Sequence, residues 1–300
     1  MSKLTSCHLC PRTCKINRNT GKTGFCNLDN RIAVSAICNH KGEEPIINGT
    51  KGICNVFFSH CNLQCIYCQN YQISNNKSVV NYKKLTDVVT EIKSVLTLSD
   101  NVLGFVSPTS QIPQMISIIE SLWKEGIKPV VIYNTNSYDR IESLQSIEKF
   151  VDVYLADMRY SLNHLAKAYS DCENYPETAI AAIREMYRQK GSSVLTDKEN
   201  VIERGLIVRV LCLPHQTDNT INILEMLADE VSTNIHISLL SQYFPPKPDL
   251  PYPLNEQLSQ HEYDRIVNYA LKKGFTKLQT QELASVNYFC PDFSKDNPFI

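Results

Sequence analysis

The sequence has few glycines and lacks the glycine-rich motifs that bind phosphates. Glycine accounts for 10 of 300 residues, and neither G-x-G-x-x-G nor G-x4-G-K-[ST] occurs. These motifs bring backbone N–H groups against phosphates at the start of a helix, so neither a dinucleotide-binding fold nor a P-loop is predicted. The 7 histidines form no H-E-x-x-H pattern, which excludes the corresponding class of zinc proteases.

Long apolar runs and a charge imbalance are missing as well. No stretch approaches the roughly eighteen consecutive apolar residues of a membrane span, and the first residues form no apolar signal segment. The formal net charge is -1, so nothing favours a bulk electrostatic attraction to nucleic acid. We therefore expect a cytoplasmic protein with neither a membrane nor a nucleic acid as partner.

Cysteine, in contrast, is abundant and occurs 12 times. In a short secreted chain this number would indicate disulfides, but here it favours metal binding in a reducing compartment. Hydrophobic residues make up 43% of the chain and charged residues 20%, so a sizeable core can be buried. The length of 300 residues suits one α/β barrel with an appendage.

Three cysteines, Cys61, Cys65 and Cys68, follow an apolar run at residues 53–58 that predicts a buried strand. Their C-x3-C-x2-C spacing lets one loop bind three irons of a [4Fe–4S] cluster and leave the fourth iron open to a small ligand. The alternative is a structural zinc site with Cys54 or His60 as fourth ligand. Zinc motifs more often use C-x2-C pairs, so we favour the cluster.

A second group of cysteines lies near the N-terminus, with C-x2-C-x3-C-x11-C spacing. It consists of Cys7, Cys10, Cys14 and Cys26. Four thiolates can enclose one zinc ion and help to fold a segment that is too small for its own core. A second Fe–S cluster that relays electrons is the competing use, and unliganded thiols are the third interpretation.

From residue 53 onward, short apolar runs alternate with amphipathic helices. Strands are expected at residues 53–58, 101–107, 128–133, 151–156, 206–213 and 234–240. Thr86 is expected to cap the first helix, residues 191–204 to form a polar loop, and residues 255–273 to form the last helix. Six strand–helix units predict parallel strands with right-handed crossovers, an α/β fold that forms a partial (β/α)6 TIM-type barrel. We divide the chain into a cysteine-rich segment (1–50), the barrel core (51–254) and a C-terminal helix and tail (255–300).

Polar side chains follow the predicted strands, at the edge where barrel enzymes place their active sites. The candidates at these strand ends are Ser107, Thr109, Asn134, Asp157 and Arg159. Each one alone is as well explained as a helix cap or a turn residue.

Arg209 interrupts an otherwise apolar strand, where a charge must be paired if it is buried. Its guanidinium can pair with a ligand carboxylate, or structurally with Asp157 or Asp152.

Several phrases of the sequence together resemble the radical S-adenosylmethionine (SAM) superfamily, in the branch of pyruvate formate-lyase activating enzyme. They are the two cysteine groups with Cys61-Asn62-Leu63 and Tyr67-Cys68-Gln69-Asn70, then Tyr133-Asn134-Thr135-Asn136, residues 154–160, and Ser241-Gln242-Tyr243-Phe244-Pro245. The resemblance runs through most of the chain, and it implies a partial barrel with one [4Fe–4S] cluster and SAM as cofactor. It also implies that Tyr67, Asn134 and Asp157 approach SAM.

The resemblance further implies that SAM is cleaved to a 5′-deoxyadenosyl radical that abstracts hydrogen from a substrate. An electron donor such as a flavodoxin or ferredoxin is expected as partner. The leading substrate is a partner protein, and a small molecule is the alternative. The non-enzymatic alternative is a zinc or Fe–S electron-transfer protein whose cysteine triplet gains a fourth protein ligand.

Overall fold

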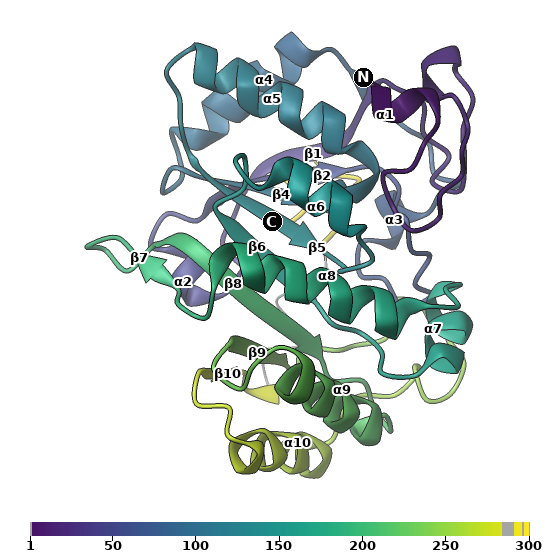
Figure 1. Ribbon diagram of the computed structural model, residues 1–300, viewed down its shortest axis with the longest axis vertical. Helices are drawn as coiled ribbons and strands as arrows, with labels where there is room; N and C mark the ends of the chain where they lie inside the picture. The colour runs from purple at the N-terminus through teal and green to yellow at the C-terminus, as the bar shows by residue number, and fades with distance from the viewer. Residues whose placement is uncertain (1, 284–290, 296, 300) are drawn as a thin grey trace.

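The structure, a computed structural model, describes residues 2–283, 291–295 and 297–299. Within them, one sheet of ten strands has the order β10-β9-β8-β6-β5-β4-β2-β1-β3, and β7 pairs with β8 (Figure 1). The strands are β1 (Ile32–His40), β2 (Ile53–Phe58), β3 (Tyr82–Lys83), β4 (Val102–Val106), β5 (Val130–Thr135), β6 (Val153–Asp157), β7 (Leu195–Thr196), β8 (Ile202–Leu211), β9 (His236–Leu240) and β10 (Leu278–Thr280).

Helices connect the strands, and in Figure 1 the helices α6, α8 and α9 lie in front of the sheet. The α-helices are α1 (Ser2–Thr5), α2 (Pro45–Asn48), α3 (Tyr71–Ser74), α4 (Leu85–Leu96), α5 (Ile112–Lys124), α6 (Ile141–Ile147), α7 (Asn163–Ser170), α8 (Tyr175–Lys190), α9 (Thr217–Glu230) and α10 (Gln260–Lys273). Two 3-10 turns, η1 (Arg18–Thr20) and η2 (Pro108–Gln111), complete the described secondary structure.

The six predicted strands are β2, β4, β5, β6, β8 and β9, and each pairs in parallel with the next. Chain order therefore equals strand order among these six strands, as expected for successive strand–helix units that form a barrel. The α/β partial barrel predicted from the sequence is confirmed. A seventh parallel strand, β10, extends it beside β9, while β1 and β3 add an antiparallel edge.

Several details of the prediction were wrong. Thr86 lies inside α4 rather than capping it, because the helix begins at Leu85 after Lys84. The predicted loop 191–204 contains β7 and the start of β8. Helix α10 begins at Gln260, not 255, because Ser259 and Glu262 form a reciprocal capping box there. Strand β5 begins at Val130 and extends to Thr135.

The predicted division into three segments stays a prediction, but the sheet draws strands from all of them. Strand β1 lies in the first fifty residues and pairs with β2, and β10 lies in the last segment and pairs with β9. The C-terminal segment includes residues 284–290, 296 and 300, which fall outside the described residues.

Side chains alternate between the two faces of each parallel strand, and the two faces differ in polarity. Outward-facing residues such as Cys54, Leu103 and Phe105 pack into the large core against the helices. The inward face carries polar residues among apolar ones. These inward polar residues are Asn55, Asn134, Asp157, Arg209 and Ser238. Strands buried on both faces normally consist of almost continuous apolar residues, so this polar interior indicates a site.

Two segments close the barrel where the strands do not. At the amino-terminal ends of the strands, α2 inserts Ile47, which packs against Ile53, Val102 and Val201. At the side, the tail around Phe293 and Phe299 packs on the inward residues of β1 and β2.

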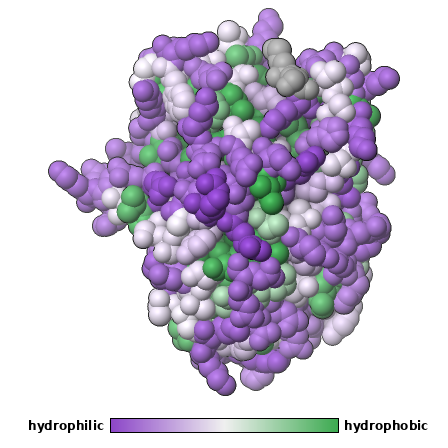
Figure 2. All heavy atoms as spheres, in the orientation of Figure 1, coloured by the Kyte–Doolittle hydropathy of each residue, from purple (hydrophilic) through white to green (hydrophobic). Residues whose placement is uncertain are grey.

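No helix among residues 2–283, 291–295 and 297–299 is long and apolar enough to cross a membrane. On the face shown in Figure 2, hydrophilic side chains dominate, and apolar side chains occur in small separate groups.

Candidate active site

The loop that follows β2 carries the cysteine triplet and is held by hydrogen bonds along most of its length. His60 adopts the left-handed conformation (φ 62), and its N–H donates to the Ile73 carbonyl at 2.7 Å. The N–H of Cys61 donates to Asn76 Oδ1 at 3.1 Å, and the N–H of Cys68 to the Cys65 carbonyl at 3.1 Å. These hydrogen bonds hold the backbone of the loop that carries the three thiols.

Each of the three thiols is approached by a polar hydrogen-bond donor. Asn136 Nδ2 lies 3.3 Å from Cys61 Sγ, Ser170 Oγ lies 2.9 Å from Cys65 Sγ, and Ser74 Oγ lies 3.2 Å from Cys68 Sγ. Hydrogen bonds to sulfur stabilise thiolates and tune the potential of Fe–S clusters. The donor set therefore fits thiolate ligands of a cluster.

Burial disfavours the free thiolate forms of this triplet. Burial, with a smaller contribution from Cys65, raises the pKa of Cys61 to about 12, and burial also raises the pKa of Cys68. Charged thiolates in such surroundings become stable when a positive metal centre binds them.

In the described part of the chain, no three His, Cys, Asp or Glu side chains converge closely enough to hold a single metal ion as they stand. A [4Fe–4S] cluster takes each thiolate on a different iron, so it does not require convergence on one point.

Neither predicted fourth zinc ligand is available to the triplet. Cys54 is buried on the outward face of β2, where its Sγ approaches the Ile92 carbonyl of α4. His60 has both ring nitrogens at backbone carbonyls, Nδ1 at Cys26 O (2.9 Å) and Nε2 at Ser78 O (3.0 Å). As the side chains stand, both are engaged elsewhere, so the zinc alternative has no fourth ligand in place at the triplet.

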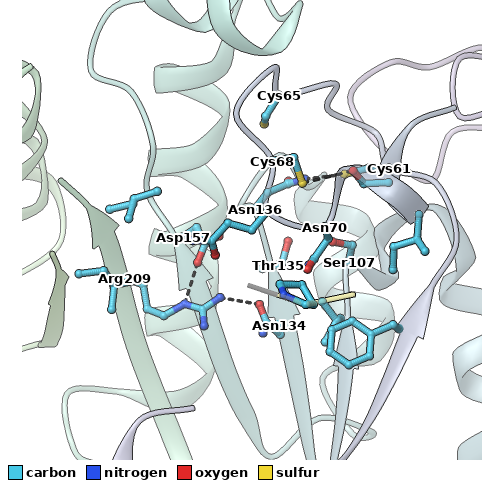
Figure 3. A pocket seen from close by; sticks show the side chains of 18 of the residues that line it. Cys61, Cys65, Cys68, Asn70, Ser107, Asn134, Thr135, Asn136, Asp157 and Arg209 are labelled. Carbon is cyan, nitrogen blue, oxygen red and sulfur yellow. Dashed lines mark hydrogen bonds and ion pairs between the residues drawn. The ribbon is translucent and has the colours of Figure 1, made fainter. Parts of the chain in front are cut away.

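The three cysteines line one end of a cavity of about 200 Å³ that occupies the barrel interior (Figure 3). Predicted site residues from four strands or strand ends share this cavity with them. They are Tyr67, Ser107, Asn134, Asp157, Arg159 and Arg209. The strand ends and the cysteine loop therefore meet in one place, as expected for a barrel whose site lies at the carboxyl ends of its strands.

Arg209 is fully engaged by protein groups inside the cavity. Its Nε donates to Asp157 Oδ1 at 2.8 Å, its Nη2 to Asn134 Oδ1 at 2.8 Å, and its Nη1 to Glu43 Oε2 at 3.2 Å (Figure 3 shows the first two). Of the two structural partners considered, Asp157 is therefore the right one. Asp152 instead accepts a hydrogen bond from the Val131 N–H at 2.8 Å.

Arg159 pairs with the other oxygen of Asp157 and still has a donor to offer. Its Nη2 lies 2.6 Å from Asp157 Oδ2, while its buried Nε has no hydrogen-bond partner in the described part of the chain. An unsatisfied buried donor is costly, so Arg159 is better placed than Arg209 to receive an anionic group of a ligand.

Tyr67 lies between Cys65 and Cys68 in the sequence, and its side chain is buried, with 3% of the residue exposed. Its hydroxyl accepts a hydrogen bond from Tyr160 at 2.8 Å, and its ring packs edge-on against Tyr243, with the ring centroids 6.1 Å apart. Burial raises the pKa of Tyr67 far above its usual range, so the phenol stays neutral. It forms a rigid, uncharged wall of the cavity.

Thr109 is the predicted site residue that the structure does not bring to the cavity. Ser107 lines the cavity in the left-handed conformation (φ 55), and the chain reverses there into η2. Thr109 is thereby turned to the helix side of the sheet, where it accepts a hydrogen bond from Tyr133 at 3.3 Å. Thr109 therefore does not line the cavity, and its role in cofactor binding stays a prediction.

The four N-terminal cysteines gather around a second, much smaller cavity of about 10 Å³ beside Asn62. Gly24 allows the close approach, because a Cβ there would stand 2.8 Å from Cys14 Sγ. The Phe25 N–H points at Cys14 Sγ at 3.4 Å, and burial raises the pKa of Cys10 to about 12. The segment packs on the cysteine loop through Arg12, whose Nε donates to the Asn62 carbonyl at 3.0 Å.

Sequence reasoning missed the acidic side of the large cavity, which His40, Glu43 and Glu44 line. His40 ends β1 and the two glutamates follow it, and the prediction did not contain this strand. The adjacent glutamates were the only signal in the sequence, and by itself an acidic pair in a loop indicates a solvated turn. Asn136, Ser74 and Ser170, which contact the thiols, were not chosen as site residues either.

Residues 47–173 match the family model described as a 4Fe-4S single cluster domain. The match includes all three cysteines of the triplet and ends before β8. An uncharacterized protein of Methanocaldococcus jannaschii is 27% identical over 282 residues, which cover 89% of this chain and 75% of the relative.

Solved structures share the fold at low sequence identity. SuiB of Streptococcus suis bound to the precursor peptide SuiA has a TM-score of 0.51 and 11% identity, covering 79% of this chain and 50% of SuiB. SuiB bound to S-adenosylmethionine has a TM-score of 0.52 and 11% identity, covering 78% and 53%. HydG, a maturase of the [FeFe]-hydrogenase, has a TM-score of 0.51 and 13% identity, covering 75% and 50%.

The match therefore spans only about half the length of each of these solved chains. Together, the comparisons show that the chain shares its partial-barrel fold with SuiB and HydG, and that residues 47–173, which contain the cysteine triplet, match a 4Fe-4S single cluster domain, as the sequence predicted.

Proposed function

We propose that this chain is a radical SAM enzyme with a [4Fe–4S] cluster on Cys61, Cys65 and Cys68. The observation that carries the proposal is the shared cavity. The three thiols, each with a hydrogen-bond donor beside it, line this cavity together with polar residues from the ends of the barrel strands. When bound, the cluster and SAM supply the hard chemistry, which is one-electron cleavage of SAM to methionine and a 5′-deoxyadenosyl radical. A low-potential donor such as a flavodoxin or ferredoxin supplies the electron.

The residues of the chain position the reactants and keep water away from them. Asn136, Ser170 and Ser74 orient the thiols, and the neutral wall at Tyr67 excludes solvent from the same end. The unpartnered Nε of Arg159 is the best placed group for the SAM carboxylate. Arg209 and Asp157 hold Asn134 and Arg159 in place, so their role is positioning.

We propose a peptide or a side chain of a partner protein as substrate, with a small molecule as the alternative. The shared fold is compatible with the first, because SuiB with this fold is bound to a precursor peptide. Product formation with peptide pools and with small-molecule candidates, measured against 5′-deoxyadenosine release, separates the two.

For the N-terminal cysteines we propose a second metal site, zinc or an Fe–S cluster. Support comes from the gathering of four thiols on one cavity and from the close approach that Gly24 permits. Metal binding would draw these sulfurs together and offset the cost of burying them as thiolates.

The test of the enzyme proposal is SAM cleavage by the anaerobically reconstituted and reduced protein. We expect 5′-deoxyadenosine from the wild type, and none from Cys61→Ala, Cys65→Ala or Cys68→Ala, each with reduced iron content. Cys212→Ala is the matched control, because this buried cysteine lines neither of the two cavities. Wild-type rates in any triplet variant would refute the ligand assignment.

A further inference from the structure

The end of the large cavity that lies away from the cysteines holds buried polar atoms without partners. Glu44 is 6% exposed, and neither of its carboxylate oxygens has a hydrogen-bond partner among the described residues. Among the same residues, Nδ1 of His40 (7% exposed) has none, and Oγ of Ser238 (0% exposed) lies beside Glu44 without a hydrogen bond of normal length. Buried polar atoms are nearly always satisfied in folded proteins, so this group is incomplete without a ligand.

The neighbouring acid, Glu43, is already taken by the protein. It accepts from Asn55 Nδ2 at 3.0 Å and from Arg209 at 3.2 Å. Gly104 makes this arrangement feasible, because a Cβ at that position would stand 2.0 Å from Asn55 Oδ1. The side chains inside the barrel therefore bind Glu43 by hydrogen bonds and, among the described residues, form none with the Glu44 carboxylate.

The charges of the cavity do not balance. Two guanidinium groups, of Arg159 and Arg209, face the carboxyl groups of Asp157, Glu43 and Glu44. Burial lowers the pKa of His40, so the imidazole adds no positive charge near neutrality. One carboxyl group, that of Glu44, thus has no ion-pair partner of its own among the described residues that line this end.

Aromatic rings line the same end. The ring centroid of Phe299 lies 3.9 Å from that of His40 and 5.6 Å from that of Phe57. Aromatic faces attract cations, and a nearby carboxylate adds a direct charge partner. An anion at this end would be repelled by Glu43 and Glu44. A cation that carries N–H groups could instead pair with the Glu44 carboxylate and donate hydrogen bonds to His40 and Ser238.

We propose that this end of the cavity binds a positively charged amino or guanidinium group of the substrate, with Glu44 as its counter-ion and His40 and Ser238 as hydrogen-bonding partners. The proposal rests on the proposed function, because it names a chemical feature of the substrate. Asn55, which holds Glu43, lies in β2 four residues before the cysteine loop begins at Ser59, a span of about 13 Å at the rise of a strand. The charged group would anchor the substrate while its reacting part lies nearer the cysteines.

The experiment compares four probes on anaerobically reconstituted full-length protein: n-butylammonium, n-butanol, butyrate and potassium ion. Binding is measured by saturation-transfer NMR, and for potassium by displacement of n-butylammonium. We expect n-butylammonium to bind more tightly than the other organic probes. We expect Glu44→Gln to raise its dissociation constant at least tenfold, and Glu44→Asp, which keeps the charge, to raise it less. Glu203→Gln, at an exposed residue of β8, is the matched control and should leave it unchanged.

Equal binding of butanol or butyrate, or an unchanged dissociation constant in Glu44→Gln, would overturn the proposal. Displacement by potassium at equal concentration would reduce the site to one for simple inorganic cations and would overturn it too. The comparison of probes on the wild type stands even if a variant does not fold. SAM cleavage by the wild type is assayed separately, without amine. Cleavage without amine binding therefore refutes only this inference, and amine binding without cleavage refutes only the enzyme proposal.

Discussion

Replacement of Arg209 by methionine tests whether the charge network organises the cavity. The side chain of Arg209 is 14% exposed, and its three hydrogen-bonded partners are Asp157, Asn134 and Glu43. Methionine fills a similar volume but leaves Glu43 without its ion-pair partner and Asp157 with Arg159 alone. Removing one partner from a buried ion pair typically costs 3–5 kcal/mol, so we expect Arg209→Met to lower the free energy of unfolding by about 3 kcal/mol.

The assay is urea unfolding followed by circular dichroism. At a slope of about 3 kcal/mol per M, a loss of this size moves the midpoint down by about 1 M. The matched control is Arg265→Met, which breaks an exposed pair with Asp218 whose side chains are 56% and 81% exposed, and it should cost no more than about 0.5 kcal/mol. Adding Glu43→Gln to Arg209→Met should restore part of the loss. Equal losses in Arg209→Met and Arg265→Met would refute the reasoning.

Three further predictions concern the thiols and the acidic side of the cavity. Ser74→Ala or Ser170→Ala removes a hydrogen bond to a cysteine sulfur, so redox titration should show a more negative cluster potential, and an unchanged potential would contradict this role. Alanine at any of the four N-terminal cysteines should lower the metal content per chain and the yield of soluble protein, whereas Cys38→Ala should leave the metal content unchanged. Burial raises the pKa of Glu44 in the folded protein. As pH rises, the unfolded chain releases the Glu44 proton at a lower pH than the folded protein does, so the free energy of unfolding falls. Glu44→Gln should therefore gain stability over the wild type, more at about pH 8 than at about pH 5.5, and a gain that shrinks as pH rises would contradict the burial.

The barrel could be predicted because its signals are local in the sequence. Each of the six parallel strands is a short apolar run followed by a helix, and repeated strand–helix units favour parallel strands that lie next to each other in chain order. The cysteine triplet lies on a single loop, so its spacing alone indicates the geometry of the ligands.

The strands that close the sheet gave weaker signals. In β1, Ser35 interrupts the apolar run and Asn39 and His40 end it, and the burial of the side chains follows no regular alternation along the strand. Strand β10 has three residues, all of them partly or fully exposed. Without β1, the sequence gives no reason to place Glu43 and Glu44 inside the barrel.

The partner of Arg209 could not be chosen from the sequence either. Asp152 and Asp157 lie on the same strand region, five residues apart. An odd separation puts them on opposite faces of a regular strand, but the choice requires the register between β6 and β8, which places Asp157 opposite Arg209.

The central claim is that one iron of the cluster on Cys61, Cys65 and Cys68 takes no protein ligand and binds SAM instead. Electron paramagnetic resonance of the reduced, reconstituted protein with and without SAM tests it most directly. We expect the cluster signal to change when SAM is added, and to be lost in Cys61→Ala. A signal from the wild-type cluster that SAM leaves unchanged, or a fourth protein ligand on the cluster, would contradict the claim.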